Sequence, residues 1–123
     1  MSEKTIILYE NYPGVRFVLE RSLSIYEGEI TVHASSVKEL LKKKIKMNGF
    51  DLLITEISQT DLDGIEISSF ARKLDPEIKI IWVTASSCSV FRQQKKRLGN
   101  ITCIEKPLEI RNFRENVLEV LEK

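Results

Sequence analysis

Short, nearly continuous apolar runs alternate with longer stretches whose apolar residues recur at helical spacing, and this alternation constrains the fold more than any other feature. We expect five strands, at Thr5–Tyr9, Ile30–Ala34, Leu52–Ile57, Ile78–Thr84 and Ile101–Glu105. The first, third and fourth runs are almost entirely apolar, which is typical of strands covered on both faces. Strands that alternate with helices predict an α/β fold built on a parallel sheet.

Apolar stripes predict the helices between and after these strands. They are Val15, Val18, Leu19 and Leu23; Val37, Leu40, Leu41 and Ile45; Ile67, Phe70, Ala71 and Leu74; and Ile110, Phe113, Val117, Leu118 and Leu121. Asp63 is suited to cap the helix that follows it. The segment between Ser87 and Leu98 has only a sparse stripe beside many charged residues, so we expect a loosely packed helix there.

Composition limits the classes of protein to which the chain can belong. A chain of 123 residues, 42% of them hydrophobic, can bury its own core, so we expect a single domain over residues 1–123. The chain has neither an apolar run of the roughly 20 residues that a membrane span needs nor a secretory signal, which predicts a cytoplasmic protein. With 19 basic and 18 acidic side chains, it has no strong overall attraction for nucleic acid.

The two cysteines, Cys88 and Cys103, form no Cys-x-x-Cys pair and have no neighbouring His cluster. We therefore expect both to be reduced. Trp82 on the fourth predicted strand and Phe91 on the fourth predicted helix are large aromatic residues, and we interpret both as core residues.

Polar residues stand at the carboxyl ends of four of the predicted strands. They are Glu10 and Asn11 after the first strand, Glu56 in the third, Thr84 at the end of the fourth, where Ala85 follows it, and Lys106 after the fifth. Because parallel strands end at the same edge of a sheet, we expect these side chains to meet there. This edge is the candidate functional site.

These residues belong to an ordered set of motifs that resembles the receiver domains of bacterial response regulators. The motifs are Glu10–Arg16, Asp51–Glu56, Asp63-Gly64, Val83–Ala85 and Glu105–Pro107, and they span essentially the whole chain. The resemblance implies a flavodoxin-like (βα)5 fold in three layers, doubly wound around a five-stranded parallel sheet of order 2-1-3-4-5. It also implies a role in two-component phosphorelay signalling.

In that family, an Asp at the end of the third strand accepts a phosphoryl group, and an acidic pair after the first strand holds Mg²⁺. A Thr or Ser after the fourth strand and a Lys after the fifth bind the phosphoryl oxygens. The positions that match the phosphoryl-binding residues here are Thr84, Ala85 and Lys106.

The chain departs from the family pattern at three places. The acceptor position is Glu56, the acidic pair is Glu10 and Asn11, and Cys103 stands where a Tyr or Phe usually acts as the switch residue. A small thiol cannot reproduce the rotation of an aromatic side chain, so these departures favour an atypical receiver, or pseudo-receiver.

The substitutions weaken both halves of the phosphorylation chemistry. Glu56 is longer than Asp by one C–C bond, about 1.5 Å, and a misplacement of about 1 Å can cost on the order of a hundredfold in rate. Asn11 offers a neutral amide oxygen where Mg²⁺ prefers a carboxylate. We expect weak or absent Mg²⁺ binding by Glu10, Asn11, Glu56 and the Ser58 carbonyl, and no other cofactor.

Two interpretations of Glu56 stay open. Its longer side chain could reach Lys106 and Thr84 and imitate part of a phosphoryl group, with one negative charge in place of about two. Alternatively, Glu56 simply pairs with Lys106 and holds the edge of the sheet closed.

We therefore expect a signalling module that binds other proteins, does not depend on phosphorylation and is not an enzyme. The resemblance implies a partner face formed by the fourth helix, the fifth strand and the fifth helix, which includes Arg92, Lys95, Lys96, Arg97, Arg111, Arg114 and Val120. A histidine kinase, an effector or a second copy of the chain, as a homodimer, would bind there.

Three other hypotheses are open from the sequence. The first is a working receiver that is phosphorylated with Mg²⁺ despite its substitutions. The second, a flavodoxin-like cofactor binder, is disfavoured because the turn after the first strand is acidic and lacks a phosphate cradle. The third, a nucleic-acid binder, would rest on the basic clusters at 42–46 and 95–97, which we interpret as solvated helix faces.

Overall fold

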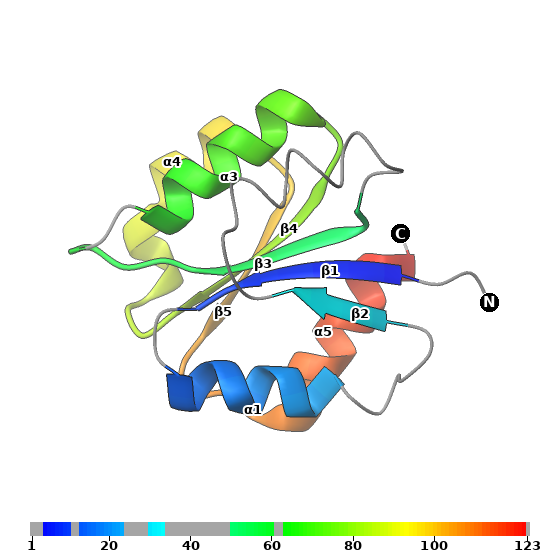
Figure 1. Ribbon diagram of the computed structural model, residues 1–123. Helices are drawn as coiled ribbons and strands as arrows, with labels where there is room; N and C mark the ends of the chain where they lie inside the picture. The colour runs from blue at the N-terminus through cyan, green and yellow to red at the C-terminus, as the bar shows by residue number, and fades with distance from the viewer. Residues whose placement is uncertain (1–3, 11–12, 24–29, 34–49, 61–62, 123) are drawn as a thin grey trace.

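A computed structural model describes residues 4–10, 13–23, 30–33, 50–60 and 63–122, which are the coloured parts of Figure 1. Only the backbone is described for residues 30–33. The predicted helix that contains Val37 and Ile45 lies outside the described residues, as do Asn11 and Ala34.

The strands form one parallel sheet in the order β2-β1-β3-β4-β5, as predicted. Their bounds are Lys4–Tyr9 for β1, Ile30–His33 for β2, Leu52–Glu56 for β3, Lys79–Thr84 for β4 and Ile101–Glu105 for β5. The register pairs Tyr9 with Thr55, and Thr84 with Glu105. The carboxyl ends of β1, β3, β4 and β5 therefore lie along the same edge of the sheet.

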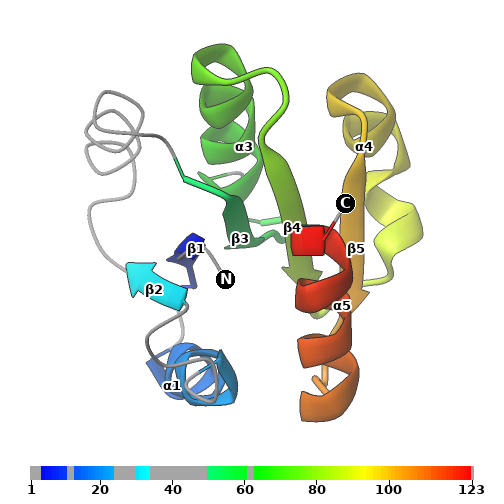
Figure 2. The same cartoon turned by 90° about the vertical axis from the view of Figure 1, so that its right-hand side faces the viewer.

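Helices cover both faces of the sheet (Figure 1 and Figure 2). One face carries α1 (Pro13–Leu23) and α5 (Ile110–Glu122). The other carries α3 (Asp63–Leu74), the short 3₁₀ helix η2 (Cys88–Phe91) and α4 (Arg92–Leu98). This is the predicted three-layer arrangement, and α3 begins at Asp63, where the sequence predicts a helix start.

The core consists of two apolar clusters, one on each face, because successive strand side chains point to opposite faces. The α3-side cluster contains Ile7, Leu53, Ile80, Trp82, Ile65, Ala71 and Phe91 among its members. The α1-side cluster contains Ile6, Leu8, Ile54, Val83, Leu19, Phe113 and Val117 among its members. The nearly continuous apolar runs of β1, β3 and β4 supply both clusters, as expected for strands covered on both faces.

Trp82 and Phe91 are core residues, as predicted. Both are buried, and their rings meet edge to face with centroids 6.3 Å apart. The indole Nε1 of Trp82 donates a hydrogen bond of 2.9 Å to the Ser68 hydroxyl, which in turn donates to the Gly64 carbonyl oxygen. These bonds satisfy the polar atoms that the aromatic core would otherwise leave unpaired.

Two apolar residues of the predicted stripes are exposed. Val18 on α1 is 41% exposed, and Ile110 at the start of α5 is 43% exposed. On α1 the buried side is formed by Leu19, Ser22 and Leu23. Ser22 can be buried because its hydroxyl donates a hydrogen bond of 2.8 Å to the Leu19 carbonyl oxygen. A serine therefore lies on the buried side of α1, where the apolar pattern predicted Val18.

Two residues predicted for the partner face do not lie on an open surface. Val120 is buried in the α1-side cluster. Arg114 is half-buried, and its Nε donates a hydrogen bond of 2.6 Å to the Ser22 carbonyl oxygen on α1. The prediction was wrong here because the side of α5 that carries these two residues packs toward the sheet and α1.

The segment from η2 to α4 is loosely packed, as predicted, because α4 buries none of its side chains. Its carboxyl end is held by Arg72 on α3, whose guanidinium donates to the carbonyl oxygens of Leu98 and, at 2.9 Å, Gly99. The Arg72 Nε also donates to the Ile78 carbonyl oxygen at 3.0 Å. A single arginine thus joins α3 to the ends of two neighbouring segments.

The prediction of reduced cysteines was wrong, because a disulfide joins Cys88 to Cys103. The two residues are 15 positions apart in sequence, but their Cα atoms are 6.0 Å apart, within the range that a disulfide requires. Cys103 lies on β5, and Cys88 begins η2 in the connection that follows β4. Only the pairing of β4 with β5 brings the two thiols together, and the spacing in the sequence carries no sign of it.

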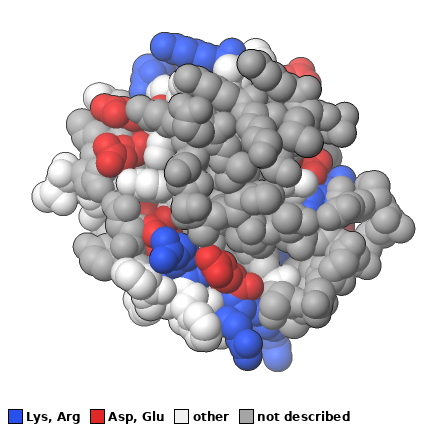
Figure 3. All heavy atoms as spheres, viewed as in Figure 1, with Lys and Arg blue, Asp and Glu red and all other residues white. Residues whose placement is uncertain are grey.

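The described surface carries charges of both signs. On the face in Figure 3, Lys and Arg side chains lie next to Asp and Glu side chains along the lower edge. Among the described residues, no helix combines the length and apolar content needed to cross a membrane.

Candidate functional site

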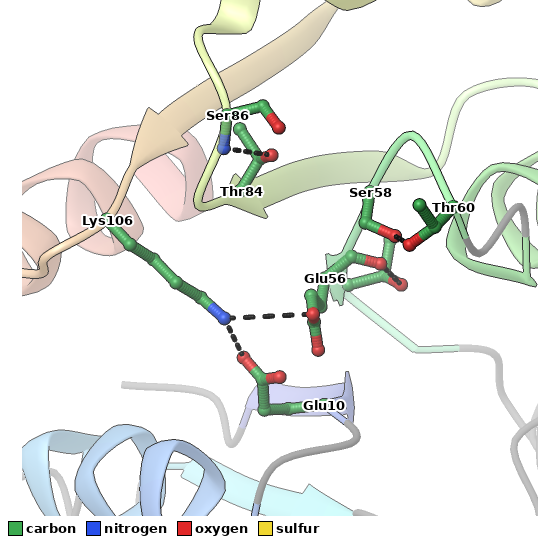
Figure 4. A network of polar contacts seen from close by, with 8 residues as sticks. Glu10, Glu56, Ser58, Thr60, Thr84, Ser86 and Lys106 are labelled. Carbon is green, nitrogen blue, oxygen red and sulfur yellow. Dashed lines mark hydrogen bonds and ion pairs between the residues drawn. The ribbon is translucent and has the colours of Figure 1, made fainter.

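Three charged side chains from three strands meet at the carboxyl edge of the sheet (Figure 4). Glu10 follows β1, Glu56 ends β3, and Lys106 follows β5. The Lys106 Nζ lies 3.0 Å from the Glu10 Oε1 and 3.9 Å from the Glu56 Oε1. The predicted convergence of these distant residues is therefore present, and the ammonium group lies between two carboxylates.

Backbone hydrogen bonds at both ends of the strands set these positions. At the amino end, the Asp51 amide donates to the Thr5 carbonyl oxygen and the Asp51 carboxylate accepts from the Thr5 amide, at 2.9 and 2.8 Å. At the carboxyl end, the Ile57 amide donates to the Val83 carbonyl oxygen at 2.9 Å, and the Lys106 amide to the Thr84 carbonyl oxygen at 2.7 Å. The last two bonds join the residues at or next to the site, Ile57 and Lys106, to the backbone of β4.

The first turn of α3 packs directly against the backbone of Glu56, and Gly64 makes this approach possible. A Cβ at position 64 would lie 1.9 Å from the Glu56 carbonyl oxygen and 2.9 Å from the Thr55 Oγ1. Both distances are far below van der Waals contact, so any side chain at this position would displace the backbone that carries Glu56. Gly64 therefore positions Glu56. The sequence motifs included Gly64, but they predicted no role for it.

Glu10 has the most strongly perturbed environment of the three. Its side chain is fully buried, whereas those of Glu56 and Lys106 keep 11% and 14% exposure. The pKa of Glu10 is raised from 4.5 to about 7, because burial, and after it a hydrogen bond with the Glu56 side chain, raise it by more than Lys106 lowers it. Near neutral pH, Glu10 therefore exchanges a proton while it contacts Lys106.

The contact distances identify Glu10 as the main partner of Lys106. Both contacts are ion pairs, and the separation of 3.0 Å from Glu10 makes the stronger Coulomb contact than the 3.9 Å from Glu56. The sequence predicted contact between Glu56 and Lys106, which is present, but it did not identify Glu10 as the closer partner. The reason is that strand register, rather than side-chain length, decides which carboxylate lies nearer to the ammonium.

Thr84 is fully buried at the end of β4, and Ala85 after it is exposed. The Thr84 hydroxyl accepts a hydrogen bond of 3.0 Å from the Ser86 amide, as Figure 4 shows. Because an accepting hydroxyl keeps its own proton, Thr84 remains able to donate to an anion.

The predicted metal ligands are only partly described. Glu10 and Glu56 meet, Asn11 lies outside the described residues, and the hydroxyl of Ser58 lies 3.4 Å from that of Thr60. Among the described residues, no group of three or more His, Cys, Asp or Glu side chains is arranged to hold a metal ion. Both carboxylates already contact the Lys106 ammonium, which a cation bound between them would have to displace.

The predicted switch position, Cys103, lies outside this charged cluster. It pairs with Trp82 in the register of β4 and β5, and it packs against the α3-side cluster. Its sulfur is bonded to Cys88, whose amide donates to the Glu105 Oε2 at 3.0 Å. The sequence pointed to neither Cys88 nor Glu105 as a functional residue, since their proximity depends on the sheet.

Comparison with known proteins identifies relatives over nearly the whole chain. Residues 6–118 match the family model described as Response regulator receiver domain. Sporulation initiation phosphotransferase F of Bacillus subtilis is 31% identical over 121 residues, which cover 98% of this chain and 95% of that protein. Sensor protein EvgS of Escherichia coli K12 is 26% identical over 106 residues, or 86% of this chain, and the aligned part is 9% of the length of EvgS.

A solved structure shares the architecture. The response regulator receiver domain protein (CheY-like) of Methanospirillum hungatei superimposes with a TM-score of 0.78 and 26% sequence identity. The superposition covers 98% of this chain and 95% of that one. The similarity therefore extends over the sheet and the helices on both of its faces.

Proposed function

The chain belongs to the response regulator receiver domain family, and on this premise we propose that it is an atypical receiver that signals through protein binding without phosphorylation at Glu56. A single observation carries the proposal. The Lys106 ammonium, at the position that binds a phosphoryl oxygen in the family, is bound by the Glu10 carboxylate at 3.0 Å and lies 3.9 Å from the Glu56 carboxylate. A phosphoryl group would have to displace contacts that the chain makes with its own side chains.

The length of Glu56 supports the proposal. Phosphoryl transfer depends on an in-line approach of the attacking oxygen and on stabilisation of charge by positioned groups. The additional methylene moves the carboxylate by about 1.5 Å, and the backbone cannot retract to compensate because Gly64 already packs against the Glu56 carbonyl oxygen. A misplacement of this size costs on the order of a hundredfold in rate or more.

The state of Glu10 adds a second obstacle. Mg²⁺ is bound through carboxylates, and it must be dehydrated in part before it binds. With the pKa of Glu10 raised to about 7, metal binding at neutral pH would have to release a proton as well as displace Lys106. We infer that Mg²⁺ binds weakly, and that phosphorylation is disfavoured before the nucleophile is considered.

Of the two interpretations of Glu56, the geometry favours the closed pair over the phosphoryl mimic. A mimic would need short contacts from Glu56 to Lys106, but the 3.9 Å separation leaves the shorter contact to Glu10. Coulomb attraction at this range is roughly 4 kcal/mol at an effective dielectric of about 20, before desolvation and side-chain entropy reduce it. The Glu56–Lys106 pair therefore stabilises the closed edge of the sheet and does not strongly favour an activated conformation.

The proposed partner is another protein with an acidic surface. Exposed Arg92, Lys95, Lys96 and Arg97 lie on α4, which has no buried residues and so presents most of its side chains to solvent. A histidine kinase or an effector of the same pathway would supply the complementary charge, and a second copy could do so through exposed acidic residues of α5. Arg114 and Val120 are excluded from this face because they pack inward.

A working receiver is the alternative, and the retention of Thr84 and Lys106 is the observation that favours it. The two hypotheses predict different results when the chain is incubated with acetyl phosphate and Mg²⁺ at neutral pH. The measurement is the intact mass, which shows whether a phosphoryl group has been gained. We expect no gain of a phosphoryl group in the unchanged chain or in Glu56→Asp alone. The double variant Asn11→Asp, Glu56→Asp should gain one, because it restores both the acceptor and the second carboxylate.

The matched control is Glu66→Asp, which removes the same methylene at an exposed position of α3. It should behave as the unchanged chain. Stoichiometric phosphorylation of the unchanged chain would disprove the atypical receiver and establish the alternative. Phosphorylation of Glu56→Asp at ordinary rates would show that the metal site works without a carboxylate at Asn11 and that our account of the metal site is wrong.

A further inference from the structure

The disulfide between Cys88 and Cys103 joins two segments that follow or contain neighbouring strands of the candidate site, β4 and β5. Cys103 lies on β5, three residues before Lys106, and Cys88 begins η2, four residues after Thr84. Both cysteines are half-buried rather than enclosed. The bond is therefore not enclosed in the core, and the titration below tests whether a reductant reaches it while the chain remains folded.

Few other contacts hold η2 against β5. The Cys88 amide donates to the Glu105 Oε2 at 3.0 Å at an exposed position, and Phe91 is the only residue of η2 that is buried. The following helix, α4, buries no side chain, and its far end is held by Arg72. The disulfide is thus the covalent part of a small set of contacts that fixes the amino end of this segment.

We propose that Cys88 and Cys103 form a reversible redox site, at which a dithiol reductant opens the disulfide and releases η2 and the amino end of α4 from β5. A thiolate of the reductant attacks one of the two sulfur atoms, which gives a mixed disulfide and releases the other cysteine as a thiolate. The second thiol of the reductant then displaces the first cysteine. The reductant leaves as its cyclic disulfide, and the chain has gained two electrons and two protons.

The chain contains its own reporter of this change. Trp82, its single tryptophan, is buried, pairs with Cys103 in the strand register and contacts the Phe91 ring at the end of η2. Both the disulfide and the segment that it holds are therefore neighbours of one indole ring. Movement of η2 would change the fluorescence of Trp82, whereas changes at Glu10 and Glu56 belong to a different set of contacts.

The test is a redox titration of the folded chain in mixtures of reduced and oxidised dithiothreitol. Alkylation followed by intact mass gives the fraction of disulfide, Trp82 fluorescence is recorded on the same samples, and hydrogen exchange is measured over residues 88–98. We expect one two-electron transition in both readouts. Reduction should speed exchange of amides in η2 and α4 about tenfold or more and lower the melting temperature by roughly 10 °C, while β1 and β3 keep their protection.

The matched control is the double variant Cys88→Ser, Cys103→Ser, which should show the exchange pattern of the reduced chain and no response to the buffer. Three results would overturn the proposal: both thiols alkylated after the oxidising end of the titration, a disulfide that resists reduction until the chain unfolds, or reduction that changes neither Trp82 fluorescence nor exchange. Each can be measured on the unchanged chain, so a poorly folded variant does not prevent a decision. The phosphorylation assay involves neither cysteine, so the two proposals can fail separately.

Discussion

At the scale of single residues, Lys106 organises the candidate site, because its ammonium lies between two carboxylates of different character. Glu10 is fully buried and close, whereas Glu56 is partly exposed and 3.9 Å away. The buried carboxylate bears the cost of desolvation, and its pKa rises to about 7. The residue that the family pattern marks as the acceptor position is therefore not the one with the tightest contact to the lysine.

The raised pKa of Glu10 predicts a pH dependence of stability. The folded chain holds an additional proton on Glu10 between pH 4.5 and about 7, so the contribution of this group is complete below that range and is lost as the pH rises through it. We expect the free energy of unfolding of the unchanged chain to fall across this range by on the order of 1–2 kcal/mol more than that of Glu10→Gln.

Urea denaturation at a series of pH values measures this difference directly. Glu66→Gln serves as the control, because it removes a carboxylate at an exposed position of α3, and it should keep the slope of the unchanged chain. Equal slopes for the unchanged chain and Glu10→Gln would mean that the buried carboxyl has an ordinary pKa.

At the scale of elements, the junction of β3 with α3 determines where Glu56 can lie. The strand β3 ends at Glu56, and α3 begins at Asp63. The next residue of the helix, Gly64, packs against the Glu56 carbonyl oxygen. The Tyr9 hydroxyl donates to the Asp63 carboxylate at 3.3 Å, which ties the start of this helix to β1. The start of α3 and the backbone of Glu56 are therefore in direct contact, so a change in one is expected to move the other.

Replacing Gly64 tests this close approach. The alanine Cβ would lie 1.9 Å from a backbone oxygen, which no side-chain rotation can relieve. We expect Gly64→Ala to reduce the free energy of unfolding by about 3 kcal/mol and to move Glu56 relative to Lys106. Denaturation measures the first effect, and the chemical shift of the Lys106 side chain measures the second.

The matched control for this change is Gly14→Ala on α1. Among the described residues, no atom beyond the chain neighbours and the backbone of α1 itself lies within 4 Å of the position that its Cβ would take. Because alanine is the better helix former, this variant should be neutral or more stable by up to about 1 kcal/mol. A Gly64→Ala variant as stable as Gly14→Ala would show that the β3–α3 junction is looser than the close approach implies.

At the scale of the whole molecule, the paired charges lie at the carboxyl edge of the sheet, and a group of exposed basic residues lies on α4. Two apolar clusters hold the strands between α1 and α5 on one face and α3 and η2 on the other. The α4 helix adds no buried side chain to either cluster. Its exposed basic residues are therefore available to bind a partner. The disulfide and Arg72 hold the two ends of the segment that carries these residues.

This arrangement predicts that binding of an acidic partner depends on α4. Lys96→Glu should weaken the complex with a kinase or effector of the pathway by roughly tenfold, and the effect should shrink as salt is added. Lys73→Glu, an equally exposed lysine on α3, is the control and should leave the affinity unchanged. Titration calorimetry at two salt concentrations gives both values, and equal losses for the two variants would place the partner elsewhere.

Much of the fold could be predicted because hydrophobic periodicity is a local property. The five strands were predicted to within one residue at the bounds that the structure describes, and Trp82 and Phe91 were correctly placed in the core. The periodicity failed at Val18 and Ser22, where a serine bonded to its own helix replaces an apolar residue on the buried side. It also failed at Val120, whose side of α5 turns toward the sheet.

The sequence by itself determined the meeting of Glu10, Glu56 and Lys106, because parallel strands end at one edge, and the order of the strands followed from its resemblance to receiver domains. Only the tertiary structure decided which carboxylate binds Lys106 more closely, that Gly64 supports Glu56, and that Cys88 and Cys103 are bonded. These features depend on distances of a few ångströms between segments far apart in the chain. Strand register and helix packing set such distances, and a pattern of residue types along one chain does not contain them.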